Sequence, residues 1–380
     1  MMIIKCLLNI MWFHKNDLKF HQSVADKSIR GYVLPHAGTK YTGKIISHTL
    51  RFKPTFKFKK VVIIYYPVSD KPNVHNRYYH EYYVPMKSIK HFIDNKWNMK
   101  KVSYVGINLR SDINKLDITD ITDTVDITDT VDITDTVDTT DSLIIVSADF
   151  SHFLPFKHAM ELENKAAMSM MFKKYNKTEY THIIDHIISF KFLNRIIPYE
   201  WYLQWIGRTR SPGKKGVGYL SFFIKEPLSL VKPDGIFVIC YDNTMVAREC
   251  LGEWFTHHHW TKHTENNLIK KVIHLGTTTS RLTGISSDLP VTYYTVTYLY
   301  SDNKKFIRGY HGIKHNAFYL PNVMLEHTHS NGKWTDSNDN EWLDGNFMLH
   351  HTLDKLTQKV GKATNGNYKL YRSEVRHFKI

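Results

Sequence analysis

The chain has 380 residues, a length that favours two domains over a single core. Hydrophobic residues make up 42% of it and aromatic residues 13%, enough for packed interiors, yet no apolar run reaches the ~20 residues of a membrane span. The net charge of +15 attracts polyanions, but Lys and Arg are spread along the chain without a nucleic-acid-binding motif, which argues against a specific nucleic-acid partner.

The three cysteines, Cys6, Cys240 and Cys250, form no CxxC pair and no disulfide framework. Such a pattern is typical of a reducing compartment, and we expect a cytoplasmic protein without membrane attachment. The apolar start of the chain contains Lys5 and lacks a small-residue cleavage site. We therefore expect it to be the first structured segment rather than a signal peptide.

In chain order, the first half alternates predicted strands with predicted helices. The strands are expected at residues 31–34, 61–66, 102–109, 143–148 and 217–224, and the helices from residue 45, at 160–175, at 181–190 and between Pro198 and Gly207. This alternation predicts an α/β domain, residues 1–225, with a mostly parallel sheet flanked by helices.

A low-complexity insert, residues 117–141, interrupts this pattern. Ile-Thr-Asp-Thr-Val-Asp occurs three times, and aspartate falls at every third position. The segment lacks the glycines of a calcium-binding β-roll, so we expect a solvated, mobile loop created by repeat expansion. The rest of the chain has a net charge of +24, and the nine aspartates of this segment reduce it to +15 for the whole chain.

Residues 226–234 are rich in turn-forming residues and are the expected linker between the domains. Beyond them, residues 291–300 alternate polar and apolar side chains, which predicts a half-buried strand. The second domain, residues 235–380, is therefore expected to be smaller and of the α+β class.

Histidine or aspartate follows several of the predicted strands. His36 follows the first strand, His75 and His80 follow the second, and Asp149 and His152 follow the fourth. Because the carboxyl ends of parallel strands face the ligand-binding edge of a sheet, these segments could converge on one divalent metal. Each histidine alone has a simpler alternative as a hydrogen-bonded structural residue.

Two of these segments resemble the signature of the Memo family. They are Pro35-His36-Ala37-Gly38 with Tyr41-Thr42-Gly43, and Ser147-Ala148-Asp149-Phe150-Ser151-His152, with Val217-Gly218-Tyr219 similar to the last strand of the family. The resemblance covers about residues 12–224. It implies the fold of class III extradiol dioxygenases, a metal ligand at His36, a site histidine at His152 and a neighbouring acid at Asp149.

The sequence also departs from that family. The usual Gly-Pro-Ser-His-His segment is replaced by Tyr66-Pro67-Val68-Ser69-Asp70, and no cysteine between residues 207 and 216 matches the late family cysteine. The spacing of His75 and His80 agrees with that in a later histidine segment of the family. The resemblance thus implies a metal site that is altered or degraded.

The second half resembles the AMMECR family. The matching segments are Arg248-Glu249-Cys250-Leu251-Gly252, Leu289-Pro290, His311-Gly312-Ile313, Tyr319-Leu320-Pro321-Asn322-Val323 and Tyr371-Arg372-Ser373-Glu374. Their order agrees with the family, and fusion of Memo and AMMECR domains is a recurring architecture, so each resemblance strengthens the other.

Cys250 is the candidate nucleophile of the second domain, with Arg248 to activate it and His311 as its candidate partner. The simpler alternative is a buried cysteine that acts as a small apolar residue. Glu249 beside the thiol opposes thiolate formation. Residues 257–259 and His263 form a histidine-rich run, which we interpret as an exposed polar loop.

The sequence predicts a metal-dependent redox or oxygen-using enzyme with a small-molecule substrate. His36 and His152 would bind iron or copper, His75 or His80 would be a third ligand, and Asp149 would be a ligand or base. The alternative is a non-catalytic protein with a degraded metal site that binds a ligand, or a protein partner through its second domain.

Overall fold

The computed structural model describes most of the chain. The described residues are 12–69, 79–112, 137–175, 183–212, 215–227, 232–255, 260–278, 290–307, 309–314, 317–326, 353–354, 356–357 and 367–380. His75, most of the repeat insert and residues 257–259 lie outside them. Of the described residues, one compact unit contains 12–166 and 175–226, and a second contains 167–174 and the residues from 227 onward.

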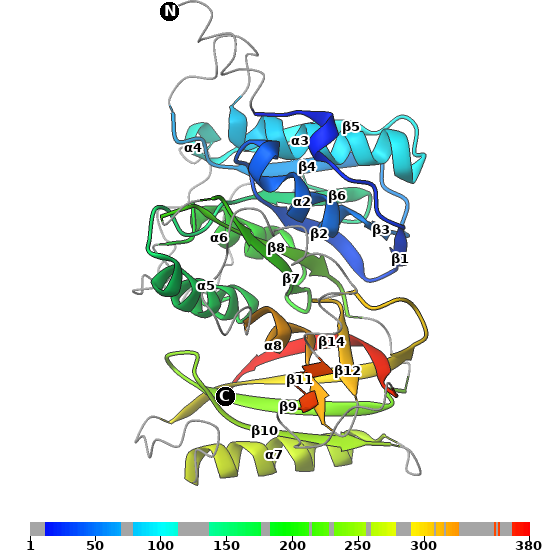
Figure 1. Cartoon of the computed structure of the whole chain (residues 1–380), viewed down its shortest axis with the longest axis vertical. Helices are drawn as coiled ribbons and strands as arrows, with labels where there is room; N and C mark the ends of the chain where they lie inside the picture. Colours follow the sequence, from blue (N-terminus) through cyan, green and yellow to red (C-terminus); the bar gives the residue numbers. More distant parts are fainter. Residues whose placement is uncertain are drawn as a thin grey trace, which may run out of the picture. The chain divides into compact units, whose positions relative to one another are not determined.

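Unit 1 is built on a mixed sheet with the strand order β5-β4-β6-β2-β8-β7 (Figure 1). These strands are β2 (Ile29–Leu34), β4 (Lys60–Tyr65), β5 (Ser103–Asn108), β6 (Ser142–Ser147), β7 (Tyr202–Arg210) and β8 (Gly218–Lys225). The pairs β5–β4, β4–β6 and β6–β2 are parallel, whereas β8 runs antiparallel to β2 and to β7. The predicted α/β class is therefore confirmed.

The central strands are buried on both faces because helices pack against the sheet. Every residue of β6 is buried, as are Val61–Ile64 of β4. Helix α2 packs against β7 and β8, while α3 and α6 pack against β4 and β6. The remaining elements of this part of the chain are η1 (Lys15–Asp17), β1 (Val24–Asp26), α2 (Thr39–Leu50), β3 (Phe52–Pro54), α3 (His80–Phe92), η2 (Ile93–Trp97), α4 (Leu109–Asp112), α5 (Phe156–Met171) and α6 (Ile188–Ile196).

Two predicted helices are wrong. The segment between Pro198 and Gly207 contributes to β7, whose residues are all buried. Because every residue of β7 is buried, its apolar residues show no period of two, and the helical spacing of Tyr202, Leu203 and Ile206 is a coincidence. The helix expected at residues 181–190 begins only at Ile188, because His186 has a left-handed backbone (φ 58°) that a right-handed helix cannot contain.

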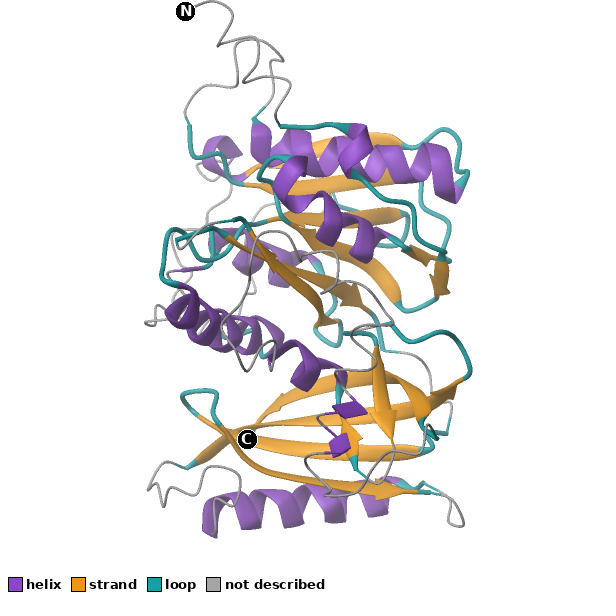
Figure 2. Ribbon diagram, in the orientation of Figure 1, coloured by secondary structure: helices purple, strands orange, loops and turns teal. Residues whose placement is uncertain are grey.

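Unit 2 contains an antiparallel sheet with the strand order β10-β9-β11-β14-β12-β13. Its elements are β9 (Gly235–Asp242), β10 (Ala247–Trp254), α7 (Lys262–Thr278), β11 (Val291–Asp302), β12 (His311–Lys314), β13 (Phe318–Tyr319), α8 (Pro321–Glu326) and β14 (Lys369–Lys379). Strand β11 contains the strand predicted at 291–300. Helix α7 runs along this sheet (Figure 2).

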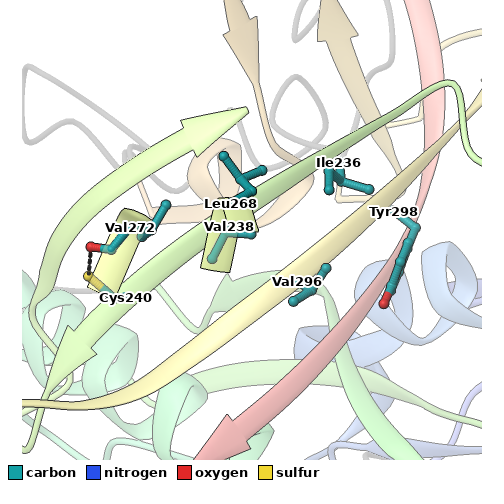
Figure 3. Close-up of a cluster of buried hydrophobic side chains, with 7 residues drawn as sticks. All are labelled: Ile236, Val238, Cys240, Leu268, Val272, Val296 and Tyr298. Carbon is teal, nitrogen blue, oxygen red and sulfur yellow. Dashed lines mark hydrogen bonds between the residues drawn. The ribbon is translucent and has the colours of Figure 1, made fainter. Parts of the chain in front are cut away.

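The core of unit 2 lies between α7 and one face of the sheet. Ile236, Val238 and Cys240 alternate along β9 and meet Leu268 and Val272 of α7 (Figure 3). The period of two along the strand and of four along the helix places each set on one face. Among the described helices of the chain, none has the length and apolar character needed to cross a membrane.

Candidate active site

The pairing of β2 and β6 brings the predicted residues His36 and Asp149 together. Leu34 and Ser147 are partners at the ends of these parallel strands, and His36 and Asp149 each follow two residues later. The backbone N–H of His36 donates a hydrogen bond to Asp149 Oδ1 at 2.9 Å. Equal offsets beyond a paired strand end therefore place the imidazole and the carboxylate side by side.

The His36 ring is enclosed by polar groups. Its Nδ1 lies 3.0 Å from Ser147 Oγ, and its Nε2 lies 3.2 Å from Asp185 Oδ2 and 3.8 Å from Asp149 Oδ2. Burial alone would lower the pKa of His36, but the carboxylates of Asp149, Asp185 and Glu81 outweigh it and raise the pKa to about 9. His36 is therefore an imidazolium at neutral pH.

His80, at the first position of α3, lies beside His36. The ring centroids are 5.5 Å apart, with the planes at 70°. His80 Nδ1 lies 3.3 Å from Glu81 Oε2, and Glu81 Oε1 accepts a hydrogen bond from the Val68 N–H at 2.8 Å. Burial lowers the pKa of His80, Glu81 opposes this, and the His36 charge lowers it further, so His80 is neutral where His36 is charged.

Asp185 and His186 complete the cluster, although neither was predicted. The Asp185 N–H donates to the Asp149 carbonyl at 3.0 Å, and Asp185 Oδ1 lies 2.9 Å from His186 Nε2. Burial alone would raise the pKa of Asp185, but hydrogen bonds from His186 and His36 lower it well below its usual range. Left-handed backbone at a non-glycine residue such as His186 costs about 1–3 kcal/mol and is concentrated at functional sites.

His152 does not join this cluster. It is exposed, forms an isolated bridge with Val217, and its ring lies 6.2 Å from that of Phe153. The preceding Ser151 points inward and donates a hydrogen bond to the buried Glu163, so the next side chain faces outward. The structure thus brings together His36, His80 and Asp149 and leaves His152 apart, while His75 lies outside the described residues.

The iron or copper centre implied by the Memo resemblance remains a prediction, because His75, one of its candidate ligands, lies outside the described residues. Within the described ranges, no group of three or more His, Cys, Asp or Glu side chains is arranged to hold a metal ion. Both ring nitrogens of His36 already face hydrogen-bond partners.

The structure does not bring Cys250 and His311 together. Cys250 of β10 is in register, through β9 and β11, with His377 of β14, whereas His311 of β12 pairs with Arg372, five residues away along β14 or about 17 Å at ~3.4 Å per residue. His311 is buried, with Nδ1 accepting the Ile307 N–H at 2.9 Å and Nε2 at 3.2 Å from Asp302 Oδ2. These contacts fasten the connection between β11 and β12.

Cys240 is the more deeply buried of the two described cysteines. It is 0% exposed against α7, and its thiol donates a hydrogen bond to the Val272 carbonyl at 3.4 Å, the dashed line in Figure 3. Burial raises the pKa of this thiol to about 11, as expected for a structural cysteine. Cys250 is half-buried.

No protein family model matches the sequence, and no curated protein matches it. The resemblances to the Memo and AMMECR families remain predictions that rest on their motifs.

Proposed function

We propose that unit 1 is an acid–base enzyme that removes a proton from a small molecule and returns it. His80 is the base that reaches the substrate, and His36 is a fixed cation behind it. The observation that carries the proposal is the pairing of two imidazoles 5.5 Å apart, one enclosed by carboxylates and the other with a side chain 33% exposed.

One of the two histidines is charged and the other is neutral because their surroundings differ. Asp149 and Asp185 keep His36 protonated, whereas burial and the His36 charge keep His80 neutral and able to accept a proton. Such a pair of groups with separated pKa values is typical of acid–base catalysis. The proton that His80 gains is stabilised by the Glu81 carboxylate beside Nδ1.

The His36 charge also favours the reaction itself. Removing a proton from a substrate leaves negative charge on it, and a cation that is already in place stabilises that charge without reorganisation. The hydrogen bond from the backbone N–H of His36 to Asp149 and the contact of the His36 ring Nε2 with Asp185 hold the ring in position. These two aspartates are therefore positioning residues rather than groups that touch the substrate.

The metal-dependent redox activity predicted from the Memo resemblance has no comparable support from the described residues. The rival from another class is a non-catalytic protein that binds a ligand or a partner. The Memo-like and AMMECR-like folds of the two halves and a cytoplasmic location belong to the proposal as well. Buried polar clusters also occur for structural reasons, so the test must detect chemistry.

Deuterium exchange provides this test. Incubated in D₂O with an extract of water-soluble metabolites, the protein is expected to transfer deuterium into a carbon position of at least one compound, detected by mass spectrometry. His80→Gln is expected to lower the rate at least about 100-fold, since general-base catalysis contributes about 10²–10⁴. The exposed His158 of α5 supplies the control, His158→Gln. Exchange that is absent in the wild type, or undiminished in His80→Gln, would contradict the proposal.

A further inference from the structure

The His80 ring has a second aromatic neighbour besides His36. The indole of Trp12 stacks on His80, with ring centroids 4.4 Å apart and the planes at 26°. His36 meets the same imidazole at 70°. The proposed base therefore contacts both a stacked indole and a charged imidazole. Its side chain is still 33% exposed, so it stays open to solvent elsewhere.

The segment that contains Trp12 is fastened to the start of α2. The Thr39 N–H donates a hydrogen bond to the Trp12 carbonyl at 3.0 Å, and the His14 N–H donates to Thr39 Oγ1 at 2.7 Å. Thr39 Oγ1 in turn donates to Asp17 Oδ2 at 2.8 Å. Thr39 is 1% exposed, so water competes little for these bonds.

A glycine allows this segment to lie close to α2. A Cβ added to Gly43 would lie 2.6 Å from the Asp17 carbonyl oxygen, so only glycine permits this approach. Thr39 itself lies three residues after His36. One short stretch of chain thus positions His36 on one side and, through Trp12, His80 on the other.

We propose that Trp12 is a positioning residue for His80, and that its indole fixes the orientation of the imidazole and closes one of its faces to reagents. This role rests on the proposed function, because the orientation of His80 matters for catalysis only if His80 is the base. The shielding of the His80 ring by Trp12 can be tested without any substrate. Stacked aromatic pairs gain their energy from buried area and ring geometry, so a phenyl ring should replace much of the effect and a methyl group should not.

The first readout is chemical access to His80. Diethyl pyrocarbonate acylates neutral imidazoles, and modification of each histidine can be followed by peptide mass spectrometry. We expect Trp12→Ala to increase the rate at His80 by about threefold to tenfold, the range that corresponds to one stacked pair. Trp12→Phe should stay close to wild type, and His158 should react equally in all variants. An unchanged rate at His80 in Trp12→Ala would overturn the proposal.

The second variant leaves the indole in place. Thr39→Val keeps the shape of the side chain but removes the hydroxyl that joins His14 and Asp17. Thr39→Val should also raise the rate of diethyl pyrocarbonate modification at His80, by less than Trp12→Ala does. A rate below that of the wild type would contradict the fastening role. If Trp12→Ala unfolds the protein, all histidines become equally reactive, and Thr39→Val then decides.

The third readout separates this inference from the proposed function. If deuterium exchange is found, Trp12→Ala should lower kcat more than it raises KM, and Trp12→Phe should restore kcat, because a positioning residue acts on the base rather than on substrate binding. If exchange is absent but His80 becomes more reactive in Trp12→Ala, the shielding of His80 by Trp12 is supported and the enzyme proposal fails. If exchange is present and kcat is unchanged in Trp12→Ala, the enzyme proposal survives and the positioning role of Trp12 fails.

Discussion

His36 is a buried charge whose partners all come from elsewhere in the sequence. Asp149 follows β6, Asp185 precedes α6, and Glu81 lies in the first turn of α3. An isolated buried imidazolium would lose its proton, but three carboxylates together reverse the effect of burial. The charge of this one residue therefore depends on the correct assembly of several loops, and it should be visible in the stability of the protein.

The stability of the wild type is expected to depend on pH through His36. Its folded pKa, about 9, lies above the ordinary value of 6.5, so the stabilisation is complete below pH 6.5 and is lost as the pH rises through 9. A shift of this size corresponds to about 3 kcal/mol. Urea unfolding at pH 6, 7, 8 and 9 should show this decline in the wild type and a much flatter profile in His36→Gln.

His158→Gln is the control for that experiment, since this side chain is exposed. The series ends at pH 9 because Cys240, whose pKa is raised to about 11, adds a second loss of stability above that pH. Equal slopes in the wild type and His36→Gln would show that His36 is not the titrating group.

Part of the site could be predicted from single residues, and part could not. His36 and Asp149 were found because both follow buried apolar strands. Asp185 and His186 were missed because they interrupt an isoleucine-rich run with helical spacing, and sequence periodicity does not reveal a left-handed residue. Glu81 could have been predicted from the sequence, because it directly follows the candidate residue His80.

At the scale of elements, the close contact of β2 with β6 determines the geometry of the site. Gly31 of β2 faces Ile144 of β6, and a Cβ at Gly31 would lie only 2.2 Å from the Ile144 carbonyl oxygen. Backbone cannot move aside as a flexible side chain can. The two strands can therefore pair in this register only when residue 31 is glycine.

Gly31→Ala is expected to destabilise unit 1 by about 3 kcal/mol or more, since overpacking against backbone is among the most costly core changes. Gly207→Ala in β7 is the matched control. A Cβ there would meet side-chain atoms at 3.3–3.5 Å, which can shift. Urea midpoints compare the two variants, and equal midpoints would show that the β2–β6 contact is looser than described.

The strands were predicted better than the helices. Runs of apolar residues located β2, β4, β5, β6 and β8 to within a few residues. The error at β7 arose because this strand is neither an apolar run nor an alternating one: all its residues are buried, and they include Gln204, Arg208 and Arg210. In β11, by contrast, the alternation of polar and apolar residues identified the strand directly.

At the scale of the whole chain, charge is distributed unevenly along the sequence. The net charge is +15, and the nine aspartates of residues 117–141 offset a remainder of +24. Charge of this size draws a protein to polyanions whether or not it has a specific nucleic-acid site. The repeat thus reduces an attraction that the rest of the chain would otherwise exert.

Replacing the nine aspartates by asparagine is expected to delay elution from a heparin column to a higher salt concentration, because binding to a polyanion strengthens with net positive charge. The matched control replaces the same nine residues by glutamate, which keeps the charge and should elute with the wild type. Identical elution of all three proteins would show that the repeat does not screen the remaining charge.

The position of β6 between two partners has a consequence for how the gene can vary. Ser142 at the start of β6 pairs with Lys60 of β4, and Ser147 at its end pairs with Leu34 of β2, so neighbours on both sides fix the register of this strand. The aspartate repeat lies before that start, and doubling the length of a connection adds only about 0.6 kcal/mol to the cost of closing it. Copies of the repeat can therefore be gained or lost between generations while the imidazole and carboxylate beyond the strand ends keep their places.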